Sequence, residues 1–135
     1  MAAATAFIAP VTANFHILGR HTMFTFGDID DYYDLIAVDS NRYNCNTMIN
    51  TETAVDDWEE DTIPTNGFFR VNPGLEGTCG KPAMNFYRRS NGNWEFYTDD
   101  GHKVGDCYAN SGFKSCTTGF QTASLTEYMW CTGAC

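Results

Sequence analysis

Apolar and polar positions alternate with a period of two through much of the second half of the chain. The clearest stretch, "NFYRRSNGNWEFYTDDGHKVGDCY", has aromatic runs separated by Asn91-Gly92 and by Asp100-Gly101. Such dipeptides favour type I′ hairpin turns, because both central residues of that turn need a positive φ. The pattern predicts three consecutive antiparallel strands over about 83–89, 93–98 and 103–108.

Other β-rich runs occur at similar intervals. "FHILGR" and "TMFTF" are predicted to flank a corner at Arg20-His21. Turn signals recur every 8–15 residues, which is typical of an all-β sandwich or barrel. The other predicted strands are "YYDLIAVD", "YNCNTMIN", "GFFRVN" and "SLTEYMWC".

Two acidic segments allow a helix. "GDIDDYYDLIAV" has early acids that suit a helix start, but its β-branched and aromatic residues favour a strand. "TAVDDWEEDTIP" predicts one short helix or an acidic loop, since Thr53 and Asp56 resemble a capping box and Pro64 gives a stop. We therefore predict a small disulfide-stabilised antiparallel β-barrel or β-sandwich with at most one short helix.

This β domain is expected to span residues 14–135 as one unit. Residues 1–13, "MAAATAFIAPVTA", are small and apolar, with Val11 and Ala13 placed as the −3 and −1 residues of a signal-peptidase site. They lack a basic start and contain Pro10. We interpret them as an N-terminal extension or the remnant of a signal peptide.

The cysteines predict covalent cross-links. Zinc sites usually use two closely spaced ligand pairs, and only Cys131 and Cys135 are close here. An even set in a short chain favours three disulfides, and disulfides imply an oxidising, extracellular compartment. Fifteen pairings are possible for six cysteines, and the spacing does not choose among them. The six are Cys45, Cys79, Cys107, Cys116, Cys131 and Cys135.

The net charge of −9 lies entirely in the residues up to Asp61, which hold eleven acids against Arg20 and Arg42. A strongly negative surface repels phosphate backbones, so nucleic-acid binding is disfavoured. No run of eighteen apolar residues occurs, and we expect no membrane span. The acids around Asp28 do not follow an EF-hand, because Tyr32 and Tyr33 take the fifth and sixth loop positions. We expect a solvated charged face with no metal or cofactor, the alternative being an irregular calcium site.

An enzymatic interpretation has one candidate set. Glu95 and His102 lie on predicted hairpin-partner strands, with Arg88 on the adjoining strand. A histidine, a carboxylate and an arginine are the groups with which small secreted ribonucleases of the guanyl-specific type work. This catalytic set is the alternative, and His102 has the simpler interpretation of a surface residue beside a turn.

A binding interpretation uses the aromatic and amide side chains. Period two places Trp94 and Tyr97 on opposite faces of their strand, while Asn91 and Asn93 lie at a hairpin end. Trp58 stands between Asp57 and Glu59 in the most acidic stretch and is a candidate contact residue. The plain alternative is that most of these aromatics belong to the core.

The composition is similar to that of small cysteine-rich proteins secreted by fungi, among them effectors, toxins and lectin-like modules. That resemblance carries over no individual residue. Together with the residues above, it favours a secreted, non-enzymatic module that binds an extracellular protein or carbohydrate. A small secreted, ribonuclease-like hydrolase is the alternative, and the oligomeric state stays open.

Overall fold

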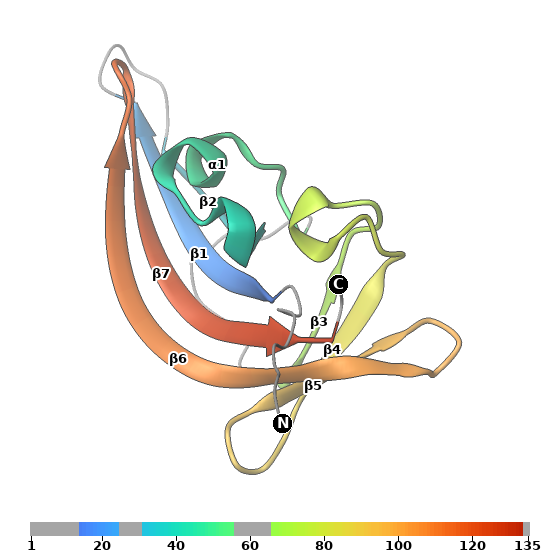
Figure 1. Cartoon of the computed structure of the whole chain (residues 1–135). Coiled ribbons are helices and arrows are strands. Elements are labelled where there is room, and N and C mark those ends of the chain that lie inside the picture. The colour runs from blue at the N-terminus through green and yellow to red at the C-terminus, as the bar shows by residue number, and fades with distance from the viewer. Residues whose placement is uncertain (1–13, 25–30, 56–65, 134–135) are drawn as a thin grey trace, which may run out of the picture.

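The computed structural model describes residues 14–24, 31–55 and 66–133. Seven antiparallel strands form one curled sheet, a half-barrel in the order β2-β1-β7-β6-β5-β4-β3 (Figure 1). The all-β prediction is therefore confirmed. The elements are β1 (Phe15–Phe24), β2 (Tyr32–Asp39), η2 (Ser40–Arg42), α1 (Cys45–Asn50), β3 (Phe68–Val71), η3 (Glu76–Thr78), β4 (Met84–Arg88), β5 (Trp94–Thr98), β6 (Lys103–Thr117) and β7 (Gln121–Thr132).

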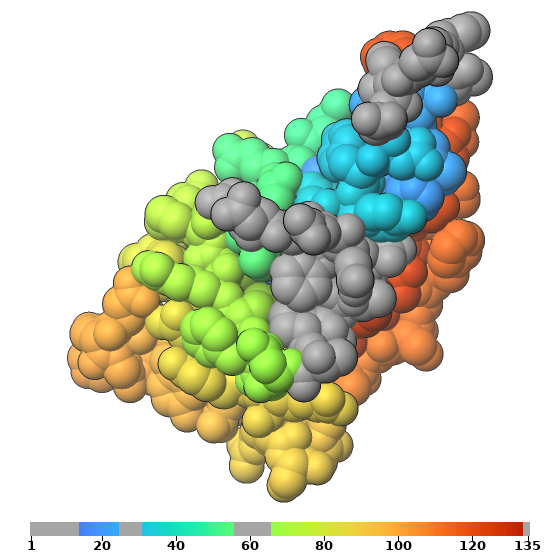
Figure 2. Space-filling view, turned by 180° about the vertical axis from the view of Figure 1, so that it is seen from behind, coloured from blue at the N-terminus to red at the C-terminus, as the bar shows by residue number. Residues whose placement is uncertain are grey.

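The period-two segments form strands as predicted. β4 and β5 coincide with the first two strands of the predicted meander, and β2, β3 and β7 form from the other alternating runs. β6 starts where expected but continues to Thr117, beyond the predicted end near 108. It extends because it pairs with β7 along most of its length, from Asp106 to Thr117. The β4–β5 and β5–β6 hairpin ends protrude from the base of the molecule (Figure 2).

Both hairpin turns are where the sequence places them, but their type differs from the prediction. In the first, Arg89 N donates to Asn93 O at 2.7 Å and Gly92 N donates to Arg89 O at 3.0 Å. The loop therefore has three residues, and only its glycine has a positive φ, 90° at Gly92. A type I turn that ends in a left-handed glycine gives this arrangement. The second turn repeats it, with a φ of 89° at Gly101.

The predicted corner at Arg20-His21 is wrong. β1 runs through it without a break, and the Arg20 side chain is only 3% exposed. Its Nη2 lies 2.6 Å from Asp34 Oδ2 and its Nε lies 3.0 Å from Asp34 Oδ1. A charge in the middle of a strand suggested a surface corner, but its partner lies directly opposite on β2. The ion pair makes burial of the arginine possible.

The prediction of a strand at "YNCNTMIN" is also wrong, because residues Cys45–Asn50 form α1. Asn44 is the N-cap, and its Oδ1 accepts from Thr47 N at 3.0 Å. At the other end Arg20 Nη1 donates to Met48 O at 2.8 Å and to Thr51 O at 3.1 Å. Caps at both ends stabilise a helix that is too short to persist alone.

Two hydrophobic clusters lie against β1 and β2. Successive residues of β2 alternate between them: Ile36 and Val38 belong to the cluster that includes Met48 of α1, and Ala37 belongs to the other. Because strand side chains alternate between faces, both faces of this part of the sheet are covered. The larger cluster holds the stacked rings of Phe86 and Phe96, whose centroids are 4.8 Å apart.

Two irregularities in strand pairing occur at the same level of the sheet. β7 shifts against β1 between Ile17 and Leu18, and β6 shifts against β7 between Ala109 and Gly112. An inserted residue bends a strand and re-aims its side chains. Met129 consequently packs in the larger cluster, while Leu125 packs in the α1 cluster.

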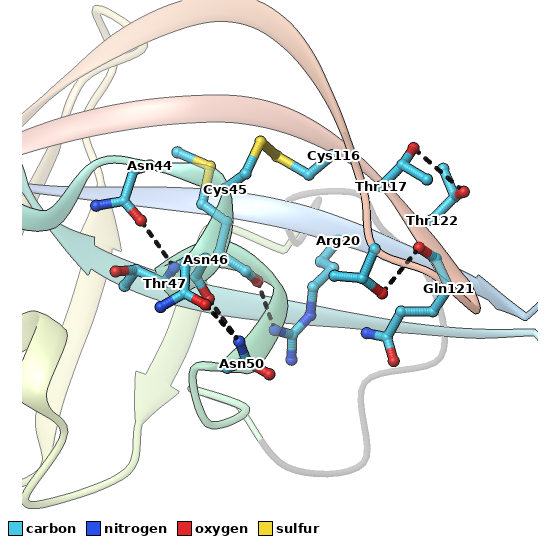
Figure 3. Close-up of a disulfide and its surroundings, with 12 residues drawn as sticks. Arg20, Asn44, Cys45, Asn46, Thr47, Asn50, Cys116, Thr117, Gln121 and Thr122 are labelled. Carbon is cyan, nitrogen blue, oxygen red and sulfur yellow. Dashed lines mark hydrogen bonds between the residues drawn. A yellow bond between two sulfur atoms is a disulfide. The ribbon is translucent and has the colours of Figure 1, made fainter.

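Disulfides reinforce both parts. Cys45–Cys116 ties α1 to β6 (Figure 3), and Cys107–Cys131 joins β6 to β7. None of the described cysteines is a free thiol. The prediction of disulfide bonding is confirmed for these four residues, and Cys135 lies outside the described residues, as do residues 1–13.

A short segment links the two edge strands. Ala54 N donates to Leu35 O of β2 at 2.7 Å, and Asn72 N, next to β3, donates to Ala54 O at 2.8 Å. The Ala54 side chain is fully buried in the larger cluster. This bridge brings the open edges of the half-barrel together and holds the aromatic cluster between them. Residues Thr53–Val55 are not helical; the rest of the predicted acidic helix or loop, 56–64, lies outside the described residues.

Candidate functional site

Three of the predicted ligand-binding residues, Asn91, Asn93 and Trp94, line one surface depression of about 270 Å³. It lies where the β4–β5 hairpin end meets β6. The other residues that line it are Arg89, Lys103, Asp106, Cys107 and Tyr108. The strand pairing explains the grouping, because Trp94 lies opposite Cys107 in the β5–β6 ladder.

The two asparagines are fixed by backbone contacts. Asn91 Oδ1 accepts from Asn93 N at 2.9 Å, which stabilises the turn. Asn93 Oδ1 accepts from Ala109 N at 3.1 Å and ties the hairpin end to β6. These bonds orient both carboxamides before any ligand arrives, which lowers the entropic cost of binding.

The exposed aromatic ring of the depression is Tyr108. Trp94 is only 3% exposed and packs against Phe69, with ring centroids 5.1 Å apart, so it serves as a wall. Tyr108 is 38% exposed and rests on Trp130 at 4.7 Å between centroids. A ring supported in this way offers a flat face at low entropic cost. The sequence did not single out Tyr108 as a contact, although its alternation with buried Cys107 places it on the outer face.

The charged groups beside the depression neutralise one another. Glu95 Oε2 lies 3.2 Å from Arg89 Nη1 and 3.3 Å from Lys103 Nζ, which also lies 2.9 Å from Asp106 Oδ1. A hydrogen bond from Tyr97, and then the neighbouring cations, lower the pKa of Glu95. The hydrogen bonds to Asp106 and Glu95 raise the pKa of Lys103. The network therefore stays charged but compensated at neutral pH.

Two further predicted contact residues are not part of this depression. The ring of Tyr97 lies beside Tyr87, 5.8 Å between centroids, on the outer face of β4 and β5. Its hydrogen bond with Glu95 connects it only to the charged network. Trp58 lies outside the described residues.

The predicted catalytic residues do not form one cluster. Arg88 lies opposite Trp94 and Glu95 lies opposite Tyr87, so Arg88 and Glu95 leave the sheet on opposite faces. The His102 side chain is 84% exposed, and its Nδ1 lies 3.0 Å from Asp100 Oδ2 within the turn. Glu95 instead pairs with Arg89 and Lys103.

A second polar group surrounds Glu127, which the sequence analysis did not single out. Its side chain is only 8% exposed and accepts hydrogen bonds from Tyr43 Oη and Asn110 Nδ2. His16 Nδ1 lies 3.3 Å from Glu127 Oε2, at ion-pair distance but without hydrogen-bond alignment. His16 Nε2 lies 3.0 Å from Ser40 Oγ. We call Ser40, His16, Tyr43, Asn110 and Glu127 the Glu127 cluster.

The fold builds this cluster at the bulges. The shifts beside Ala109 and Ile17 bring Glu127 level with Asn110 and direct its side chain toward the α1 cluster. The ring of Tyr43 packs on that of His16 with centroids 4.3 Å apart, and Lys114 Nζ lies 5.1 Å from the Tyr43 ring centre. A lone acid inside the apolar alternation of β7 was the available sequence signal, because a buried acid needs partners.

The electrostatics favour a charged Glu127. Burial alone would raise its pKa, but hydrogen bonds from Tyr43 and Asn110 and the nearby His16 lower the pKa of Glu127 below its ordinary value. Burial, and then the hydrogen bond to Glu127, raise the pKa of Tyr43. The cluster therefore holds a carboxylate beside a histidine that contacts an exposed serine.

Among the described residues, no group of three or more His, Cys, Asp or Glu side chains is arranged to hold a metal ion. In the same part of the chain, no helix has the length and apolar character needed to cross a membrane. A scan against protein-family models finds no match, and searches of curated proteins and of solved structures also find none.

Proposed function

We propose that the chain is a secreted, disulfide-stabilised β module that binds an extracellular glycan at the depression beside Tyr108. The disulfides support an oxidising compartment, in which such bonds persist. The observation that carries the glycan assignment is the combination of one supported aromatic face with a rim of fixed amides and paired charges.

A sugar ring presents an apolar face and several hydroxyl groups. The Tyr108 ring suits the face, and the rim of Arg89, Asp106 and the asparagines supplies donors and acceptors for the hydroxyls. Because the charges compensate one another, the site suits a neutral sugar better than a strongly charged one. The volume of about 270 Å³ lies just below the range of about 300–1,000 Å³ common for small-molecule sites, so we expect one sugar unit to be held.

A neutral-glycan array with the unreduced protein tests this proposal. Hits are then titrated against wild-type protein and Tyr108→Ala, which we expect to weaken binding at least tenfold. Tyr32→Ala is the matched control, because Tyr32 is 44% exposed and belongs to β2, outside the depression. Equal affinity of the two variants, or no binding to any glycan, contradicts the proposal.

An RNase assay on the same sample tests the hydrolase alternative. Turnover that disappears in His102→Gln would support the alternative in place of glycan binding. The proposed binding function predicts no such turnover. Ellman titration of denatured, unreduced protein tests the compartment, and secretion predicts almost no reactive thiol.

A further inference from the structure

We propose that Ser40, His16 and Glu127 form a nucleophile–base–carboxylate triad that transfers the acyl group of a small ester to Ser40 and then to water. The contacts have the required order, with Ser40 Oγ 3.0 Å from His16 Nε2 and His16 Nδ1 3.3 Å from Glu127 Oε2. An exposed hydroxyl, a histidine in the middle and a buried acid at the far end define the roles of this arrangement wherever it occurs.

Burial increases along the triad. Ser40 is exposed, the His16 side chain is 19% exposed and the Glu127 side chain is 8% exposed. An ester can therefore reach the serine, while the carboxylate stays shielded from water. Glu127 is held by Tyr43 and Asn110, so it acts on His16 from a fixed position. The imperfect alignment of His16 with Glu127 is common in ligand-free sites, where catalytic hydrogen bonds tighten only with substrate.

The elements that carry the triad are rigid. His16 belongs to β1 and Glu127 to β7, two strands paired in the middle of the sheet. Ser40 directly follows β2, and its backbone N donates to Asn14 O at 2.8 Å. The His16 ring is also supported by Tyr43. Side chains on paired strands keep catalytic geometry better than side chains on long loops.

The proposed steps balance without a cofactor. Ser40 Oγ attacks the acyl carbon while His16 Nε2 takes the hydroxyl proton, and the ester C–O bond breaks as that proton passes to the leaving alcohol. Water then attacks the acyl-serine and gives a proton to His16, which returns it to Ser40 Oγ as the acid leaves. The sum is one ester and one water converted to an alcohol and an acid. Glu127 is the positioning residue for the His16 imidazole.

The neighbouring surface indicates the alcohol part. His16 lies directly opposite Trp130 in the β1–β7 ladder, and Trp130 supports the Tyr108 ring. A sugar that rests near Tyr108 and carries a short O-acyl group would place an ester on the same side of the sheet as His16. This substrate class rests on the proposed glycan binding, whereas the triad itself does not.

The decisive experiment needs no variant. Wild-type protein is treated with a fluorophosphonate serine reagent and, separately, with p-nitrophenyl acetate, and the modified peptide is identified by mass spectrometry. We expect the adduct on the peptide that contains Ser40. Absence of an adduct there, or equal labelling of exposed Ser90 and Ser40, overturns the proposal.

Variants then assign the roles. Ser40→Ala is expected to reduce p-nitrophenyl acetate turnover to the uncatalysed rate, while Ser90→Ala keeps it. His16→Gln should lower turnover by a factor on the order of 10⁴. His102→Gln is its control, because His102 contacts Asp100 rather than a serine. Unchanged turnover in Ser40→Ala would show that any esterase activity has another origin.

Glu127→Gln separates positioning from structure. We expect kcat to fall by about 10²–10⁴ while KM stays within about twofold. A purely structural role would instead lower the melting temperature without changing the kcat of the folded fraction. Since p-nitrophenyl acetate has no sugar, its hydrolysis tests the triad even if no glycan binds. Tyr108→Ala should lower only the turnover of an O-acetylated sugar.

Discussion

The bulges divide the molecule into two parts that are stabilised in different ways. The helix-covered half consists of α1, residues 18–24 of β1, and residues 112–117 and 121–127 of β6 and β7. The hairpin half consists of β3, β4 and β5 with the remaining parts of β6 and β7. The first buries charge, in Arg20, Asp34 and Glu127, and the second buries aromatic rings.

This difference bears on where chemistry is placed. Buried charges must be fully paired, so the helix-covered half fixes polar groups in one geometry, as the Glu127 cluster shows. The aromatic packing of the hairpin half needs no polar partner and leaves its outer polar groups to solvent. We therefore assign the acyl-transfer proposal to the first and the ligand-binding proposal to the second.

The strongest test of the comparison is Arg20→Met. The substitution leaves Asp34 buried without its partner and removes donors from Met48 O and Thr51 O. We expect a loss of about 3–5 kcal/mol in the free energy of unfolding, measured by urea titration. The control is Arg70→Met, since Arg70 and its partner Asp99 are 51% and 61% exposed.

An exposed ion pair is worth less than about 1 kcal/mol, so Arg70→Met should leave the urea midpoint nearly unchanged. Similar losses for both arginine variants would mean that buried charge pairing is not what stabilises the helix-covered half.

Removing one disulfide at a time compares the halves directly. Cys45–Cys116 spans 71 residues in sequence and Cys107–Cys131 spans 24. In the chain-entropy model, loss of the longer loop costs about 4 kcal/mol and loss of the shorter about 3 kcal/mol. The paired alanine variants, measured by urea titration, should follow that order.

Packing acts in the opposite direction, because Cys107 and Cys131 are both fully buried whereas Cys45 is exposed. A larger loss for Cys107→Ala/Cys131→Ala would show that packing of the buried sulfurs outweighs loop entropy in the hairpin half.

The turn glycines of the hairpin half give a smaller effect. Gly92→Val places a β-branched residue at a φ of 90°, although no atom lies within 4 Å of the added Cβ. We expect a loss of about 1–3 kcal/mol from backbone strain alone, measured by thermal or urea unfolding.

Gly119 is the matched control, because it also has open space around its Cβ but no positive φ. Gly119→Val should change stability by less than about 0.5 kcal/mol. Equal effects would assign the loss at Gly92 to something other than its φ.

These glycines also show what the sequence could predict. Alternation and turn dipeptides are local signals, and they located β4, β5 and both turns of the meander. The turn type was missed because three-residue loops with a single left-handed glycine use the same Asn-Gly and Asp-Gly pairs. The local pattern therefore determines the position of a turn more firmly than its geometry.

The errors fall where a distant residue decides the outcome. α1 forms because Arg20, from a strand remote in sequence, binds its last carbonyl groups, while its own residues have no strong helical period. Ser40, His16 and Glu127 come from three separate segments, and two bulges bring them into contact. Such bulges carried no signal in the sequence pattern that we used, so the Glu127 cluster was not predicted.

The smallest expected effect concerns acid stability in the helix-covered half. The pKa of Glu127 is lowered in the folded protein, so its contribution to stability is fully present above the unfolded value of about 4.3 and is lost as the pH falls through the folded pKa. Urea titrations at pH values from about 6 to 3 should show stability decreasing more steeply in wild type than in Glu127→Gln.

Glu52→Gln is the control for the loss of one acid, because Glu52 is exposed. Its stability should follow wild type across the acid range, since an exposed carboxylate gains little on folding. Parallel curves for wild type and Glu127→Gln would mean that the hydrogen bonds from Tyr43 and Asn110 do not favour the charged carboxylate. The triad would then lack the fixed negative charge that its histidine needs, and the contrast between the two halves would concern packing alone.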